Sequence, residues 1–168
     1  IYLPKKILLT ISILIIFCHN LLDEMTFKGH SFIEVLWYIS HQMNGFSISE
    51  NRMVWFTYPI LPWIGVILLG YCFGNLYTKE TNTIKRKEIL LTVGISSIIL
   101  FFLLRGINIY GNLTKWEVQD TVAKTLISFF KITKYPPSLV FLLITLGPAF
   151  IFLAFIENIQ NSISKFFL

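Results

Sequence analysis

Charged side chains are scarce in this chain: only 14% of its 168 residues are Asp, Glu, Lys or Arg, whereas soluble domains have about 25%. The 14 basic residues outnumber the 9 acidic ones, but they cluster in loops and form no continuous basic stripe. The scarcity argues against a soluble domain, and the clustering argues against a nucleic-acid-binding surface. Because 55% of the residues are hydrophobic, the composition predicts an integral membrane protein.

Cysteine is also rare, and the motifs of many soluble enzymes are missing. Cys18 and Cys72 each lie in an apolar run, so we predict neither a disulfide nor a zinc site. The sequence has no glycine-rich phosphate loop, no HExxH pair, no nucleophile-elbow serine and no acids paired at catalytic spacing. We therefore predict no metal site, and the residues alone identify no catalytic group.

Long apolar runs are abundant, and they predict an all-α, polytopic transmembrane helix bundle. A bilayer is crossed by about 20 apolar residues in a helix. Amphipathic spacing predicts additional interfacial helices at 32–39 and 116–130. About four segments suit a membrane span, near 5–22, 57–77, 89–109 and 136–157.

The second apolar segment has features that a simple lipid-facing anchor does not need. Pro59 and Pro62 lie in its first turns, where a missing N–H is tolerated, and Trp63 follows them. Gly70 and Gly74 form a small-xxx-small pair, which favours close approach of another helix. We predict a packed helix whose proline-rich start lines a site.

Basic residues flank the apolar segments unevenly, and this predicts an orientation. Lys5 and Lys6 precede the first segment, and the short loop at 79–88 follows the second. Under the positive-inside rule this side is cytoplasmic. The connections at 23–56 and 111–135 then lie outside, although the second also carries four lysines. The basic residues of the short loop are Lys79, Lys85, Arg86 and Lys87.

Arg105 is the sharpest polar feature, because it ends an apolar run where a charge is costly. It either reaches the lipid headgroups or binds an anion in a cavity. Lys134 precedes Tyr135 and a double proline, and it either anchors its span in the interface or provides a second cation. Such a mouth would suit a phosphate or carboxylate. The candidate substrate-binding or cofactor-binding residues are Arg105, Tyr110, Lys134, Tyr135, Tyr58 and Trp63.

The histidines give weaker signals. His19 and Asp23 are four residues apart and share a helix face, which would orient the imidazole, but we interpret His19 as structural. His30 and His41 lie in the long connection without evident partners. Asp23 and Glu24 are interpreted as ordinary loop charges.

Three blocks in this order resemble the bacterial membrane proteins related to heparan-alpha-glucosaminide N-acetyltransferase. They are YPILPWIGVILLGYCFG at 58–74, RGINIYG at 105–111 and KYPPSLVFLLITLGPA at 134–149. The resemblance implies an acyltransferase of the bacterial inner membrane that moves acetyl from cytosolic acetyl-CoA to a sugar or amino-sugar acceptor across the bilayer. It also implies that acetyl-CoA is a co-substrate and that no cofactor is bound. The expected partners are the lipid bilayer, acetyl-CoA, the acceptor and, as an open point, a second copy of the chain.

The family usually opens with an Asp–Arg–Gly helix followed by a histidine thought to act in acetyl transfer. Here the one Arg–Gly pair is Arg105–Gly106, in a different block. His19 lies outside the three blocks, so we do not assign it that role. Since the chain also begins on Ile1, we expect 1–168 to be a partial domain that is inactive alone.

Two other functions stay open beside acetyl transfer. A transporter or exporter of an anionic solute would use kinked helices around a cationic mouth, and it should show two related halves. A non-catalytic membrane scaffold would use the prolines and tyrosines only for packing.

Overall fold

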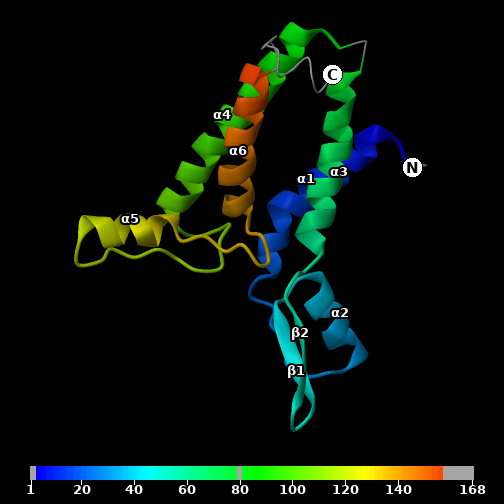
Figure 1. The fold of residues 1–168 in the computed structure, drawn as a ribbon, viewed down its shortest axis with the longest axis vertical. Coiled ribbons are helices and arrows are strands. Elements are labelled where there is room, and N and C mark those ends of the chain that lie inside the picture. Colours follow the sequence, from blue (N-terminus) through cyan, green and yellow to red (C-terminus); the bar gives the residue numbers. More distant parts are fainter. Residues whose placement is uncertain (1–2, 79–80, 157–168) are drawn as a thin grey trace.

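The structure, a computed structural model, describes residues 3–78 and 81–156. Long helices dominate it, which confirms the predicted all-α class, and a single small hairpin is the only sheet in the described ranges (Figure 1). In chain order the elements are α1 (Lys5–Cys18), the short 3-10 turn η1 (His19–Leu22), α2 (Phe32–Ser40), β1 (Asn44–Ser49), β2 (Arg52–Phe56), α3 (Leu61–Phe73), the 3-10 turn η2 (Gly74–Tyr77), α4 (Thr83–Ile107), α5 (Val122–Phe130) and α6 (Leu139–Ile156).

Three helical stretches are long and apolar enough to cross a membrane, judged by length and composition. They are Lys5–Leu22, Thr83–Ile107 and Leu139–Ile156. The remaining predicted span, Leu61–Tyr77, is also apolar but shorter. Its helix begins at Leu61, later than the predicted start at 57, and the residues just before Leu61 are not helical. Pro62 occupies the first turn, where its missing N–H costs little.

The start of α4 differs from the prediction, which placed the third span at 89–109 after a charged loop. Asn82 caps the helix, because its side-chain oxygen accepts a hydrogen bond from the Ile84 N–H at 2.9 Å. The helix therefore begins at Thr83 and includes most of the basic residues that we assigned to the loop.

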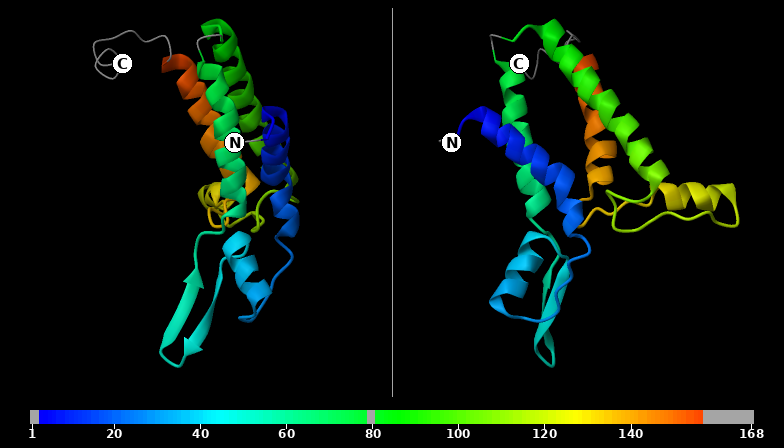
Figure 2. Two further views of the ribbon diagram at one scale, coloured as in Figure 1. Left: turned by 90° about the vertical axis from the view of Figure 1, so that its right-hand side faces the viewer. Right: turned by 180° about the vertical axis from the view of Figure 1, so that it is seen from behind.

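In the right-hand view of Figure 2, α3 and α6 stand nearly upright, and α1 and α4 are inclined to them. α1 packs on α3, and α4 packs on α6. One buried cluster joins the two pairs, with Ile16 from α1, Phe101 from α4 and Leu142 from α6, while Val66 and Leu69 of α3 pack against it. The core is therefore shared by all four helices.

The close approach between helices is not where the sequence predicted it. A Cβ added at Gly70 or Gly74 would meet no described heavy atom within 4 Å, so the prediction of a packed small-xxx-small pair is wrong. α1 instead crosses α3 nearer the start of α3, at Gly65. A Cβ added at Gly65 would lie 2.9 Å from Cγ2 of Ile15. The crossing point depends on the packing of both helices, and a glycine spacing in one helix does not determine it.

α4 and α6 approach each other closely at a glycine from each helix. A Cβ at Gly94 would lie 2.6 Å from Cγ1 of Ile151 and 2.8 Å from the carbonyl oxygen of Gly147. Only residues without side chains fit this crossing, because real Cβ atoms do not come so close to a backbone oxygen. α6 continues through Pro148.

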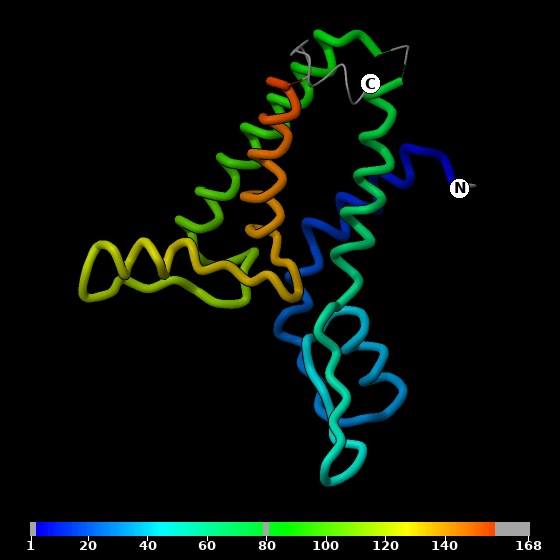
Figure 3. Tube along the Cα trace, in the orientation of Figure 1, coloured from blue at the N-terminus to red at the C-terminus, as the bar shows by residue number. Residues whose placement is uncertain are grey.

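The connection between α1 and α3 forms a small unit beyond the helix ends (Figure 3). It contains α2, as predicted, and the antiparallel β1–β2 hairpin, which we did not predict. Turn signals around Asn44 and Ser49 border strands too short for apolar alternation to stand out. Tyr38 of α2 is fully buried, and its hydroxyl donates to the Gly29 carbonyl at 3.0 Å.

α5 lies across the end of the α4–α6 pair and projects sideways from it (Figure 1). The predicted helix at 116–130 is shorter than expected, since only Val122–Phe130 is helical. Its exposed residues include Val122 at 78% and Ile127 at 70%. A position at the membrane surface stays a prediction.

Candidate functional site

Four helix ends meet at one end of the helix bundle, which we call the mouth. The C-terminal ends of α1 and α4 lie there with the N-terminal ends of α3 and α6 (Figure 1). Two cavities open among the loops of the mouth, and Asp23 and Leu113 line both. The Tyr110 cavity, of about 440 Å³, is lined by residues that include Asn20, Asp23, Glu24, Tyr110, Asn112 and Lys115. The His41 cavity, of about 230 Å³, is lined by residues that include Asp23, His41, Gln42, Leu113, Tyr135 and Pro136.

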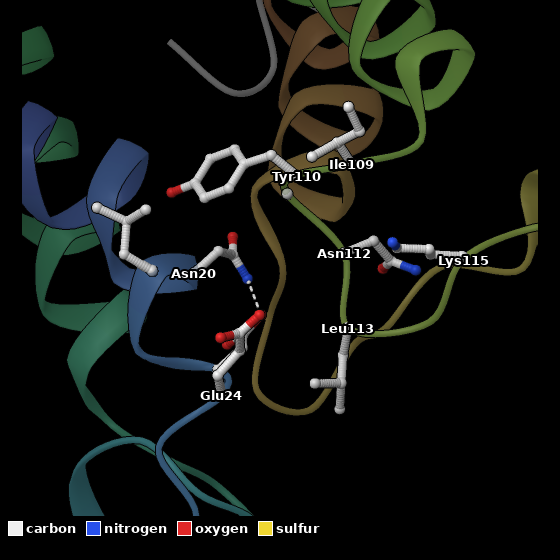
Figure 4. Close-up of a pocket in the computed structure, with 10 residues that line it drawn as sticks. Asn20, Glu24, Ile109, Tyr110, Asn112, Leu113 and Lys115 are labelled. Atoms are coloured by element: carbon white, nitrogen blue, oxygen red, sulfur yellow. Dashed lines mark hydrogen bonds between the residues drawn. The ribbon is translucent and has the colours of Figure 1, made fainter.

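The Tyr110 cavity presents donors and acceptors from two segments. Figure 4 shows Asn20 and Glu24 on one side and Asn112 and Lys115 on the other. Burial raises the pKa of Tyr110, and the negative charge of Asp23 raises it further. The phenol is therefore protonated at neutral pH, and it donates to the carbonyl of Phe17. Such a lining suits a ligand with several hydroxyl or amino groups.

A chain of hydrogen bonds joins the two cavities. The Asn20 amide donates to Oδ2 of Asp23 at 2.7 Å, and Nε2 of His41 lies 3.0 Å from Oδ1 of the same carboxylate. Asn20 is fixed in turn, since its Oδ1 accepts the backbone N–H of Leu139 at 2.8 Å. Asp23 is thus held from both sides, and the first turn of α6 is part of the same network.

His41 is buried, and its two nitrogens have different surroundings. Nε2 faces Asp23, whereas Nδ1 is buried and has no hydrogen-bond partner in the described part of the chain. The ring packs beside Trp37 at 5.4 Å and edge-on to His19 at 6.1 Å between centroids. Buried polar atoms are nearly always bonded, so this nitrogen needs an explanation.

His19 occupies a different environment, and its contacts agree with a structural role. Nε2 lies 2.9 Å from the Pro137 carbonyl, and Nδ1 lies 3.0 Å from the carbonyls of Ile15 and Ile16. Both nitrogens therefore face backbone oxygens. His19 ties the end of α1 to the double-proline segment before α6.

Arg105 is buried among protein atoms, at 2% exposure. Its described hydrogen bonds all go to backbone carbonyls: Nε donates to Phe129 at 2.8 Å, Nη2 to Ser128 at 3.0 Å and Nη1 to Thr114 at 3.4 Å. Ser128 and Phe129 belong to the last turn of α5. The guanidinium thus satisfies carbonyls that a helix end leaves unpaired, and it lines neither of the two cavities.

The other candidate residues divide into two groups. Tyr135 lines the His41 cavity, and its hydroxyl donates to that of Tyr58 at 3.2 Å. Lys134 is exposed beside the Tyr135 ring, with Nζ 5.1 Å from the ring centroid. Trp63 is half-buried in the first turn of α3. Neither Lys134 nor Trp63 lines the two cavities. Of the six candidate residues, only Tyr110 and Tyr135 do so, and Tyr58 is bonded to Tyr135.

The sequence analysis did not identify Asp23, Asn20 and His41 as a group. The four-residue spacing of His19 and Asp23 did draw attention to this carboxylate, but its bonded imidazole belongs to His41, 18 residues further along. That pairing arises from the path of the connection, which no local spacing encodes.

The comparisons with known proteins give one match. A protein-family model described as heparan-alpha-glucosaminide N-acetyltransferase, catalytic, matches residues 1–106. The matched part includes residues 1–57, which the three sequence blocks do not cover, and it therefore contains His19, Asp23 and His41. No curated protein and no solved structure matches the chain.

Proposed function

Because the chain belongs to the family of heparan-alpha-glucosaminide N-acetyltransferase catalytic domains, we propose that it serves transfer of an acetyl group from acetyl-CoA to an amino sugar. The reaction would cross the inner membrane of a bacterium. The family suggests a membrane acetyltransferase, and the apolar helices agree with an integral membrane protein. The donor, the acceptor and the membrane are our proposals.

The observation that carries the proposal is the polar mouth of an otherwise apolar bundle. The carboxylates of Asp23 and Glu24 would attract the ammonium form of an amino sugar. Asn20, Asn112 and Tyr110 offer side-chain groups of the kind that bind sugar hydroxyls. We therefore assign the acceptor to the Tyr110 cavity.

The opposite end of the bundle suits the phosphates of CoA. Lys5, Lys6, Lys85, Arg86 and Lys87 lie there, at the starts of α1 and α4. An apolar cavity of about 290 Å³ lies between the ends, lined by residues of α1, α3, α4 and α6. It offers a path along which the acyl-bearing arm of CoA would approach the mouth.

The test uses the intact protein in sealed vesicles, with labelled acetyl-CoA on the basic side and glucosamine on the mouth side. We expect labelled N-acetylglucosamine on the mouth side. Glu24→Ala should raise the KM for glucosamine about 2- to 5-fold, the effect of one exposed charge. Glu50→Ala, in the exposed hairpin turn, is the matched control and should not change it.

The alternatives give different outcomes in the same vesicles. Movement of an anionic solute without acetylation would indicate a transporter. If the vesicles show neither solute movement nor acetylation, a scaffold is the remaining function. Either of these two outcomes would contradict the proposed function.

A further inference from the structure

We propose that the acceptor is a glycolipid, an amino sugar joined to an alkyl chain, and that it enters the Tyr110 cavity sideways from the bilayer. This inference rests on the proposed function and names its class of acceptor. Its evidence is separate, because it concerns the apolar part of the cavity lining. Leu21 and Ile109 line the cavity, and their side chains are 66% and 74% exposed.

The Tyr110 cavity lies where two candidate membrane spans end. Leu21 belongs to the span Lys5–Leu22, and Ile109 follows soon after the end of the span Thr83–Ile107. Since α1 packs on α3 and α4 packs on α6, the cavity lies between the ends of helices from different pairs. Its apolar part is therefore at the depth where the hydrocarbon core of a bilayer gives way to the headgroups.

The lining of the cavity is apolar on one side and polar on the other. Figure 4 shows Ile109 beside the end of α4 and Glu24 on the opposite side of the cavity. A sugar dissolved in water would use the polar groups, and an exposed leucine and isoleucine would add little to its binding. An alkyl chain attached to the sugar would cover both of these side chains, which is favourable because apolar surface leaves water.

Tyr110 forms the boundary between the two sides. Its hydroxyl donates to the Phe17 carbonyl, and its ring packs against the buried core cluster. This bond ties the segment after α4 to α1, and so it holds the two sides of the opening together. Ile13 and Phe17, on the preceding turns of α1, are exposed as well and share a face of the helix. Apolar surface therefore continues from Leu21 toward the middle of the bilayer.

The charges of the cavity favour one kind of amphiphile over another. Exposed apolar side chains are normal on a membrane helix, but Leu21 and Ile109 line the same cavity as the carboxylates of Asp23 and Glu24. Lys115 is the one cation among the described lining residues, so the lining has a net negative charge. It favours a head with an ammonium group and disfavours a phosphate between head and chain, as in a phospholipid.

The chemical step is that of the proposed function, with the amine on a lipid-anchored sugar. The amine nitrogen attacks the thioester carbonyl of acetyl-CoA, a C–N bond forms and the C–S bond breaks. The thiolate of CoA leaves with the electron pair of the C–S bond, and water takes the proton that the nitrogen loses. The product is an N-acetylated glycolipid that can return to the bilayer through the same opening.

The first experiment compares dodecyl glucosaminide with glucosamine as acceptors for the intact protein in vesicles with acetyl-CoA. A dodecyl chain concentrates any glycoside in a bilayer, so the informative quantity is the change between protein variants. The double variant Leu21→Ala/Ile109→Ala should raise the KM for dodecyl glucosaminide at least about 5-fold, because it removes apolar contact with the chain. The KM for glucosamine should change less than about 2-fold, since the polar groups are intact.

The matched control is Ile67→Ala, which shortens an equally exposed side chain of α3 that lines neither cavity of the mouth. It should leave both KM values unchanged.

The second experiment measures binding to the wild-type protein without any reaction. A dodecyl glucosaminide with a photoreactive diazirine near the sugar end of its chain should crosslink to Leu21 and Ile109 or their sequence neighbours. Excess dodecyl glucosaminide should displace the probe. Dodecyl glucoside, which lacks the amine, should displace it about 2- to 5-fold less well, because one exposed charge interaction is lost.

The outcomes separate this inference from the proposed function. If the wild type acetylates both acceptors and the double variant raises both KM values equally or neither, the inference is wrong and the function stands. Crosslinks spread over all lipid-facing helices without displacement would mean that ordinary membrane lipid fills the opening, which also overturns the inference. If the wild type acetylates neither acceptor but the crosslinks form and are displaced as expected, the proposed function fails and glycolipid binding stands.

Discussion

Arg105 is a buried cation whose described hydrogen bonds all end on backbone carbonyls. Two of these carbonyls, on Ser128 and Phe129, lie in the last turn of α5, where partial negative charge gathers. The guanidinium carbon also lies 5.5 Å from the centroid of the Phe129 ring. These contacts explain how the charge is tolerated at the end of an apolar helix, and they favour a structural role. Anion binding by Arg105 stays a prediction, and it would require the guanidinium to release these carbonyls.

Arg105→Ala should lower the free energy of unfolding by about 2–4 kcal/mol, because it leaves buried carbonyls unpaired. α5 should also become more sensitive to protease. Both effects can be measured in nanodiscs, by thermal unfolding and by limited proteolysis. Lys134→Ala is the control, since Lys134 is exposed, and its effect should stay within about 0.5 kcal/mol. A stable Arg105→Ala protein that loses acetyl transfer would instead support the anion-binding role.

At the residue scale, the sequence predicted single unusual side chains better than groups. Arg105 and the tyrosines of the mouth stood out because charge and hydroxyl groups interrupt apolar runs. Asp23 and His41 were interpreted as a loop charge and a histidine without a partner. Their contact depends on how α2 and the segment before it pack, and this packing is not visible in local spacing.

The packing of the helices in the bundle depends on glycines that let two backbones come close. Gly94 and Gly147 form the crossing of α4 and α6, whereas Gly70 and Gly74 face no described atom within 4 Å. Since apolar side chains gain little from leaving lipid for a helix interface, such close backbone contacts contribute much of helix association in membranes.

Gly94→Ala should destabilise the protein by about 1–3 kcal/mol, because the new methyl group would meet the Gly147 carbonyl oxygen at 2.8 Å. Gly70→Ala makes the same chemical change in a helix with open space beside it. It should be neutral or stabilising by up to about 1 kcal/mol. Thermal unfolding of both variants in nanodiscs tests the difference, and equal effects would contradict the assigned crossing.

Element types were predictable where the apolar pattern is long. α1, α4 and α6 followed from their length and composition, and α2 followed from its amphipathic spacing. The hairpin did not, because strands of six and five residues show too little alternation. Helix starts were also misplaced where a cap decided them, as Asn82 does for α4.

The molecule as a whole separates its polar groups into two ends. The Lys5 ammonium donates to the Asn75 side chain, and Arg86 donates to the Leu76 carbonyl at 3.0 Å. The starts of α1 and α4 and the end of α3 therefore lie together, at the end away from the mouth (Figure 1). The basic residues at the start of α1 (Lys5 and Lys6) and near the start of α4 (85–87) therefore lie on one side of the bundle. The orientation predicted from the positive-inside rule requires this arrangement.

The orientation itself can be tested with single cysteines in a protein whose Cys18 and Cys72 are replaced by serine. Ser47→Cys lies in the exposed hairpin at the mouth, and Lys85→Cys lies at the basic end. In intact cells a membrane-impermeant maleimide should label Ser47→Cys, whereas Lys85→Cys should react only after permeabilisation.

The proposed reaction depends on this result. The basic end must face the cytosol, where acetyl-CoA is, and the mouth must face the other side, where the acceptor is. Labelling of Lys85→Cys from outside would put the mouth and both of its cavities in the cytoplasm. Acetyl transfer would then stay on one side of the membrane, and transfer across the bilayer would be excluded.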